Sequence, residues 1–232
     1  MVQVNNNTPI VLRVKFYKKG SLQYISHLDL VRTMMKVIVR AKLPLWYTEG
    51  FNPKPKLTFA APLSIGTESM CEYMDIRLTE KIPTAIAKER LNANMTDEMQ
   101  ATEVYYPGEK LTALKWLAYE ITLEIKDATP ELAEKINSVL ESEELQVFKK
   151  TKSGEALVNI KPLIKSASAR VAGQRIMISC ILSADPSAFL NPEYVIKVLK
   201  EKCGILSDDN LLEERYSIMR TNAYKENMTL FS

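Results

Sequence analysis

The sequence predicts an α+β protein made of two ferredoxin-like (split βαβ) halves, with helices packed on antiparallel sheets. First, the chain has 232 residues, of which 46% are hydrophobic, 25% are charged and seven are glycine. This is enough to bury the core of one large or two small domains, and it excludes a disordered or collagen-like chain. Second, apolar residues recur with the period of a strand in some segments and of a helix in others. Third, these segments follow the order β-α-β-β-(β)-α-β twice, which is typical of split βαβ sandwiches.

In the first half, residues 10–17 alternate apolar with basic side chains, as a half-buried strand does. Ser26 can cap the helix that follows, Asp29 supplies the acidic half of a capping box, and Pro44 ends the helix after about residue 42. The remaining pattern predicts a helix over 83–95 and strands over 45–48, 57–63, 73–78 and 100–106.

The second half repeats this rhythm without obvious sequence identity to the first. Thr129 and Pro130 open a helix as its cap and its first residue, and residues 151–154 read as the turn of a hairpin. The pattern predicts a second helix over 191–202 and strands over 116–125, 145–150, 156–164, 175–183 and 212–220. Pro107-Gly108 separates the halves, so we expect domains at 1–108 and 109–232.

Charge is unevenly distributed along the chain. Residues 1–70 hold ten Lys and Arg against three Asp and Glu, a net charge of +7, whereas residues 71–232 hold 21 against 25, a net charge of −4. A basic first third favours an anionic partner such as RNA. The alternative is an uneven spread of solvated lysines.

Composition excludes several kinds of chemistry. The chain has a single histidine, and its three cysteines (Cys71, Cys180 and Cys203) form no CxxC pair, so we expect no metal site and no cofactor. No standard nucleotide-binding or hydrolase motif occurs, which argues against an enzyme. The odd, widely spaced cysteines fit a reducing cytoplasm. The N-terminus does not resemble a signal peptide, and no apolar run approaches the roughly 18 residues of a membrane span.

Two candidate groups lie on the first predicted helix. His27 is at its start, where the helix dipole favours a neutral imidazole, which suits a general base oriented by Asp29. The alternative is that His27 only caps or packs. Arg32, Lys36 and Arg40 recur at every fourth position and form a basic line that could meet a phosphate backbone, although any solvent-facing helix surface can look like this.

A third candidate is the segment over 46–56, which combines stiff backbone with aromatic and basic side chains. Exposed aromatic rings stack on bases while lysines bind phosphates, the usual arrangement in single-stranded RNA recognition. The alternative is a proline-stiffened connection in which Trp46 and Phe51 are buried. The candidate RNA- or anion-binding residues here are Trp46, Tyr47, Phe51, Asn52, Lys54 and Lys56.

Several motifs carry a resemblance to a known family. They are YISHLDL over 24–30, YTEGFNPKPKLTF over 47–59, PLSIGTES over 62–69 and EYMD over 72–75. The sequence is similar here to the bacterial radical-SAM-linked proteins, a family of unknown function. Its members are fused behind a radical SAM enzyme or are encoded beside one, and their gene neighbours tend to be RNA-processing enzymes. Since this chain lacks a three-cysteine cluster, the resemblance implies an accessory of such an enzyme rather than the catalyst.

Three functional hypotheses follow. The first is a binding module that presents RNA, such as tRNA or rRNA, to a radical SAM partner. The second is a protein-only docking subunit of that enzyme. The third is a metal-independent RNA-processing enzyme in which His27 is the general base and Lys54 or Arg32 stabilises charge.

Overall fold

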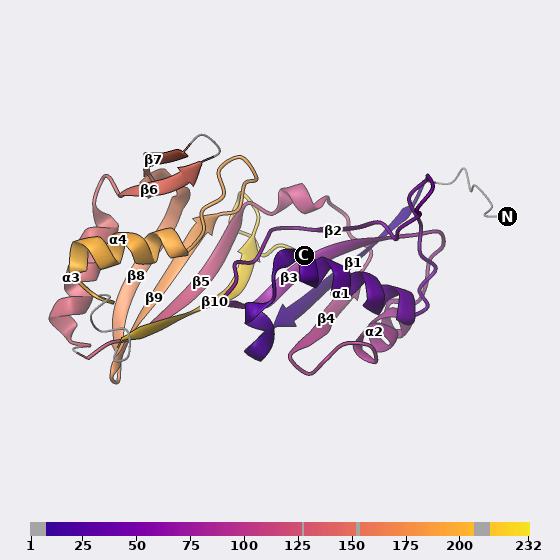
Figure 1. Ribbon diagram of the computed structural model, residues 1–232, viewed down its shortest axis with the longest axis horizontal. Coiled ribbons are helices and arrows are strands. Elements are labelled where there is room, and N and C mark those ends of the chain that lie inside the picture. The colour runs from indigo at the N-terminus through magenta and orange to yellow at the C-terminus, as the bar shows by residue number, and fades with distance from the viewer. Residues whose placement is uncertain (1–7, 127, 152–153, 207–213) are drawn as a thin grey trace. The chain divides into compact units, whose positions relative to one another are not determined.

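The computed structural model describes residues 8–126, 128–151, 154–206 and 214–232 (Figure 1). The tip of the predicted hairpin and the start of the predicted strand at 212 lie outside these residues. The chain divides into two compact units: the first ends at Ala113 and includes Ser232, and the second is Leu114–Phe231.

Unit 1 has the strand order of a split βαβ sandwich. Strand β1 pairs antiparallel with β3 and β4, and β2 pairs antiparallel with β3, so the order is β4-β1-β3-β2. The parallel strands β1 and β2 are thus separated by β3, as this fold requires. The elements are β1 (Ile10–Lys18), α1 (His27–Arg40), β2 (Leu57–Phe59), β3 (Thr67–Leu78), α2 (Thr84–Asn92) and β4 (Met99–Tyr105).

The core of unit 1 lies between its sheet and its helices. One side of β1 and β3 is apolar and fully buried, and α1 packs on it with the buried side chains of Leu30, Met34, Val37 and Ile38. Ser26 caps α1 as predicted: the Asp29 amide donates to Ser26 Oγ at 3.1 Å. The helix therefore begins where the sequence places it, because a side-chain acceptor replaces the missing helical one.

Unit 2 repeats the same order. Strand β5 pairs antiparallel with β9 and β10, and β8 pairs antiparallel with β9, so the order is β10-β5-β9-β8. Strands β6 and β7 form a separate two-stranded sheet inserted between α3 and β8. The elements are β5 (Trp116–Glu124), α3 (Pro130–Glu141), β6 (Gln146–Thr151), β7 (Gly154–Asn159), β8 (Ile164–Ala172), β9 (Arg175–Ser183), α4 (Glu193–Cys203) and β10 (Arg215–Tyr224). The predicted α+β class, with helices on antiparallel sheets, is confirmed.

Four predicted strands differ from the structure. Residues 45–48 make only isolated bridges, Leu45 with Leu78 on β3 and Tyr47 with Pro55, because the chain turns away from the sheet and folds back on itself. The strand predicted at 57–63 ends at Phe59, and the strand predicted at 73–78 begins at Thr67, where pairing with β1 extends it. The segment 156–164 is interrupted by a 3-10 turn at Lys161–Leu163, after which β8 forms a strand that the pattern missed.

No helix among the described residues is long and apolar enough to cross a membrane.

Candidate nucleic-acid interface

The segment between α1 and β2 folds back as a narrow hairpin, called here the first ribbon (residues 46–56). The Thr48 amide donates to the Lys54 carbonyl at 2.9 Å, and the Lys56 amide donates to the Trp46 carbonyl at 3.1 Å. The Thr48 side chain also accepts the Lys54 amide at 3.1 Å. These bonds hold the two arms together on either side of the tip at 49–53.

The base of the first ribbon is fixed to β3. The Trp46 amide donates to the Arg77 carbonyl at 2.9 Å, and the Arg77 amide donates to the Lys56 carbonyl at 3.0 Å. At the tip, Gly50 has φ +116°, a backbone conformation that favours glycine. Pro53 at the tip and Pro55 on the returning arm stiffen the backbone. The side chains on this segment are therefore carried on a well-anchored support.

The first ribbon exposes the predicted binding residues. The side chain of Phe51 is fully exposed at the tip (110% relative exposure), and Tyr47 is 42% exposed. Asn52, Lys54 and Lys56 are exposed as well, whereas Trp46 is half-buried, with Lys56 Nζ 5.5 Å from the centre of its ring. The structure thus does not bury Phe51 as a packing residue.

The basic line on α1 also faces solvent. Arg32, Lys36 and Arg40 are all exposed. Asp29 lies 3.1 Å from Arg32 and partly offsets its charge. Among the described residues, the hydrogen bonds of the first ribbon run within the ribbon or to β3, and none joins it to these helix cations. The structure therefore exposes both predicted sets of basic side chains in unit 1.

His27 is the exposed first residue of α1, and its ring meets the Phe59 ring edge-on at 5.4 Å. The Asp29 carboxylate accepts from Ser26 Oγ at 2.7 Å and from Arg32. The hydrogen bond from Ser26, followed by that from Arg32, lowers the pKa of Asp29. Among the described residues, the Asp29 carboxylate bonds to Ser26 and Arg32 and not to His27, the residue that it was expected to orient. A general-base role for His27 stays a prediction.

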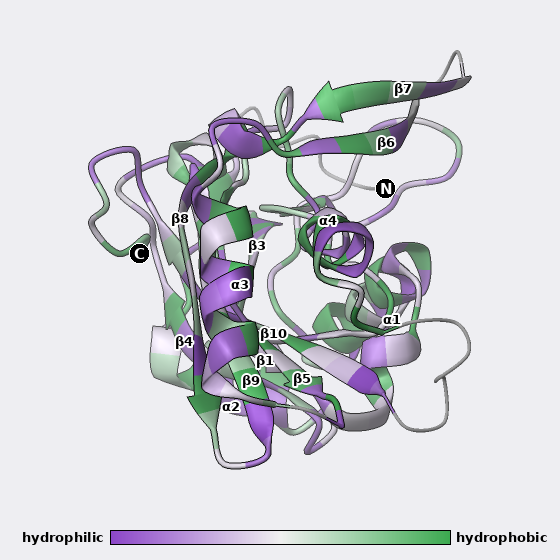
Figure 2. Ribbon diagram, turned by 90° about the vertical axis from the view of Figure 1, so that its left-hand side faces the viewer, coloured by the Kyte–Doolittle hydropathy of each residue, from purple (hydrophilic) through white to green (hydrophobic). Residues whose placement is uncertain are grey.

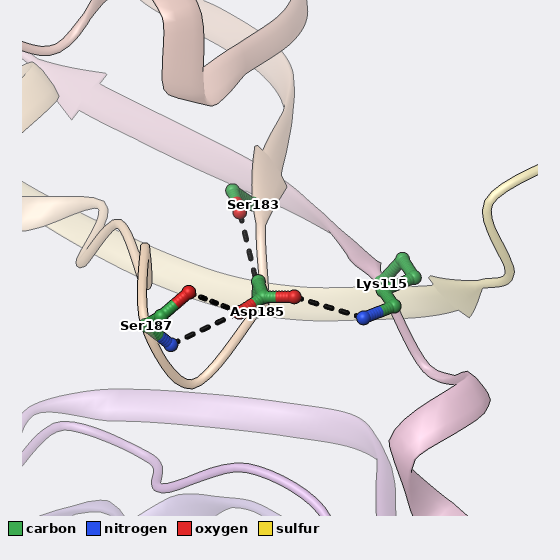
Figure 3. Close-up of polar contacts among 4 residues, drawn as sticks. All are labelled: Lys115, Ser183, Asp185 and Ser187. Atoms are coloured by element: carbon green, nitrogen blue, oxygen red, sulfur yellow. Dashed lines mark hydrogen bonds and ion pairs between the residues drawn. The ribbon is translucent and has the colours of Figure 1, made fainter.

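A polar cluster in unit 2 was not predicted from the sequence (Figure 3). Lys115 Nζ lies 2.8 Å from Asp185 Oδ2, and Ser187 donates to Asp185 Oδ1 from its amide and its hydroxyl at 3.0 and 2.6 Å. The Asp185 amide donates to Ser183 Oγ at 3.4 Å. The bond from Lys115 is the largest cause that holds the pKa of Asp185 well below its usual range. This cluster ties the turn after β9 to the start of β5, and its partners are 70 residues apart, beyond the reach of local patterns.

Side chains that could bind a metal ion do not cluster among the described residues, and the Cys180 thiol is buried. No group of three or more His, Cys, Asp or Glu side chains is placed there to hold a metal ion. Burial raises the pKa of the Cys180 thiol to about 12, which keeps it protonated and unreactive at neutral pH.

Comparison with solved structures gives distant similarity. A chain of the "Crystal Structure of a Cbf5-Nop10-Gar1 Complex" matches with a TM-score of 0.49 and 12% identity, over 93% of this chain and 50% of that one. This chain thus spans half the length of that relative. An "Unknown Protein from Galdieria sulphuraria" matches with a TM-score of 0.26 and 9% identity, over 92% of this chain and 99% of that one. "DyPB from Rhodococcus jostii RHA1" matches with a TM-score of 0.21 and 8% identity, over 93% and 94%.

No curated protein matches the chain by sequence. The family described as "Uncharacterized protein conserved in bacteria (DUF2344)" matches residues 11–192, which include the first ribbon, α1 and most of unit 2. The chain belongs to this bacterial family.

Proposed function

We propose that the protein is an RNA-binding accessory of a radical SAM enzyme and that the first ribbon makes its principal RNA contact. The observation that carries this proposal is the fully exposed Phe51 ring at the tip of a hydrogen-bonded ribbon, with Lys54 and Lys56 exposed on the returning arm. An aromatic ring left in water contributes nothing to the core, whereas it can stack on an unpaired base.

The energetics agree with this assignment. Stacking of one base on an aromatic side chain contributes about 1–3 kcal/mol, and each phosphate contact adds a salt-dependent term. Because the two ends of the first ribbon are hydrogen-bonded to β3, its backbone loses little conformational freedom when RNA binds. The net charge of +7 over residues 1–70 would attract the polyanion to unit 1.

Binding of labelled single-stranded RNA and of total tRNA, measured over a salt series, tests the proposal. Phe51→Ala is expected to weaken binding by about 5- to 150-fold, the stacking energy of one base. Replacing Lys54 and Lys56 with alanine should flatten the slope of log affinity against log salt by about 1.4, or 0.7 for each phosphate contact.

The charge-matched control replaces Lys110 and Lys126, which are also exposed, and should bind as the unaltered protein does. If Phe51→Ala and the ribbon lysine variant both bind RNA with unchanged affinity and salt slope, the proposal is wrong.

The association with a radical SAM enzyme rests on the family resemblance, and one surface of unit 1 favours a docking role. Tyr24, Leu28 and Ile65 are 67%, 56% and 59% exposed, an unusual set of large apolar side chains around the start of α1. A hydrogen bond joins the two loops that carry Tyr24 and Ile65, since the Gly66 amide donates to the Gln23 carbonyl at 2.9 Å.

Leu28→Asp should abolish co-purification with an enzyme encoded beside the protein and leave RNA affinity unchanged. Co-purification that survives this change would remove the surface from consideration.

A further inference from the structure

Unit 2 carries an insertion at the same point of the fold as the first ribbon. In unit 1 the ribbon over 46–56 lies between the first helix, α1, and the second strand, β2. In unit 2 the pair β6–β7 lies between the first helix, α3, and the second strand, β8. We call β6 and β7 the second ribbon. Since both units share one strand order, the two ribbons occupy equivalent positions in the fold.

The second ribbon also presents an aromatic ring to solvent. Phe148 on β6 is paired directly with Leu157 on β7, so their side chains share one face, and they are 52% and 54% exposed. The opposite face is packed, because Val147 is 1% exposed. In both ribbon views the second ribbon lies beside α4 at the edge of its unit, and hydrophobic segments are visible on both of its strands (Figure 2).

The ammonium group of Lys197 lies beside this apolar pair, because Lys197 Nζ on α4 donates to the Phe148 carbonyl at 3.2 Å. Lys149, the next residue along β6, extends on the packed face, where its Nζ donates to the Phe189 carbonyl at 3.3 Å and lies 5.6 Å from the centre of the Tyr194 ring. An ammonium group has three N–H donors, so Lys197 can donate to a further acceptor.

The second ribbon is basic, unlike the rest of the second half. Residues 146–159 hold three Lys against one Glu, a net charge of +2. The other residues of 109–232 hold fourteen bases against seventeen acids. The charge of the ribbon is therefore complementary to a polyanion rather than to a neutral apolar partner.

We infer that the second ribbon is a second RNA contact, in which Phe148 stacks on a base beside Leu157 while Lys197 meets a phosphate. This inference rests on the proposed RNA-binding function and adds a second point of attachment in unit 2. Two contacts on one chain raise affinity more than either alone, provided that one RNA can reach both.

The experiment compares RNA affinity across Phe51→Ala, Phe148→Ala and the double variant of the full chain. Phe148→Ala is expected to weaken binding about 5- to 150-fold, and the double variant should show the product of the two single effects. Phe148→Leu keeps an apolar side chain without a ring, so it should also weaken binding and guards against a fold defect. Ultraviolet crosslinking of the unaltered protein to RNA should label Phe148 as well as Phe51.

Ile86→Ala, which removes a side chain 40% exposed on α2, is the matched control and should bind normally. If Phe51→Ala weakens binding while Phe148→Ala and Phe148→Leu do not, the inference is overturned and the proposed function stands. If the unaltered protein binds no RNA, both are overturned. Loss of a protein partner in Phe148→Ala with unchanged RNA affinity would overturn the inference by making this ribbon a protein-docking surface.

Discussion

Two ion pairs on strand β1 show how burial determines the contribution of an ion pair to stability. Arg13 is 0% exposed and binds Asp75 through Nε at 2.8 Å and Nη2 at 3.2 Å. Lys15, two residues later, binds Glu103 at 2.7 Å, and both of these side chains are partly exposed. Removing one partner of a buried pair leaves the other charge without a partner and without water. At the surface, water solvates the charge that remains.

We therefore expect Asp75→Ala to reduce the free energy of unfolding by about 3–5 kcal/mol. Glu103→Ala, the matched surface change, should cost at most about 1 kcal/mol. Urea denaturation of the two variants beside the unaltered protein measures the difference. Equal effects of the two changes would contradict this account.

Asp185 makes a pH-dependent contribution to stability. Its pKa is lowered in the folded protein, first by the bond from Lys115 and then by the bonds from Ser187. A lowered folded pKa means that the carboxylate stabilises the fold above its ordinary range, and this contribution is lost as pH falls from about 3.9 through the folded pKa.

The melting temperature of Asp185→Asn should accordingly lie below that of the unaltered protein at neutral pH, and the gap should narrow as pH falls below about 4. Thermal melts across an acid pH series follow this gap. A gap that stays constant with pH would show that the side chain stabilises the turn by its shape and not by its charge.

At the level of elements, one asparagine covers an edge strand in each unit. Asn92 on α2 donates to the Ala101 carbonyl at 3.1 Å and accepts the Ala101 amide at 2.8 Å on β4. Asn137 on α3 does the same for Ala169 on β8, at 2.9 and 2.7 Å. An edge strand exposes backbone groups that invite pairing with another chain, and these amides satisfy two such groups at each edge.

Asn92→Ala and Asn137→Ala should each destabilise the protein by about 1–3 kcal/mol, because each leaves an edge donor and acceptor without their side-chain partner. Hydrogen exchange at Ala101 and Ala169 should accelerate only in the variant that affects that strand. Asn94→Ala is the control, since the Asn94 side chain, two residues after α2, bonds only to the Arg90 carbonyl among the described residues. Unchanged exchange at both alanines would contradict the role of these side chains.

On the scale of the whole molecule, the boundary of the first unit lies at Ala113. The sequence places it at 108, from Pro107-Gly108 alone. The buried guanidinium of Arg13 reaches beyond that point, because its Nη2 donates to the Glu109 carbonyl at 2.9 Å. We propose that the first unit folds independently and that residues 109–113 belong to it.

A fragment of residues 1–113 should therefore unfold cooperatively and keep the RNA contact of the first ribbon. A fragment of residues 1–108 loses the Glu109 acceptor and should be less stable by about 1–3 kcal/mol. Urea denaturation compares the two fragments. Equal stability would place the boundary at Gly108.

Local patterns in the sequence were sufficient for much of this fold. The alternation in residues 10–17, the Ser26 and Thr129 caps and the prolines around 44 and 130 act within a few residues, so helix starts and the α+β order followed from them. The basic and aromatic content of the first ribbon was visible in the same way. The missed strand β8 shows the limit, because its residues are mostly small or polar and pairing with β9 supplies what the local sequence does not.

The sequence by itself determined the α+β class and the helix starts, where charge is concentrated along the chain and which side chains are candidates for binding RNA. Only the tertiary structure decided the bounds of β2, β3 and β8, the exposure of Phe51 and Phe148, and the asparagines that cover each edge strand. The physical reason is the separation in sequence over which each interaction acts. Caps and periodicity depend on neighbours along the chain, whereas exposure and edge pairing depend on contacts between residues far apart in sequence.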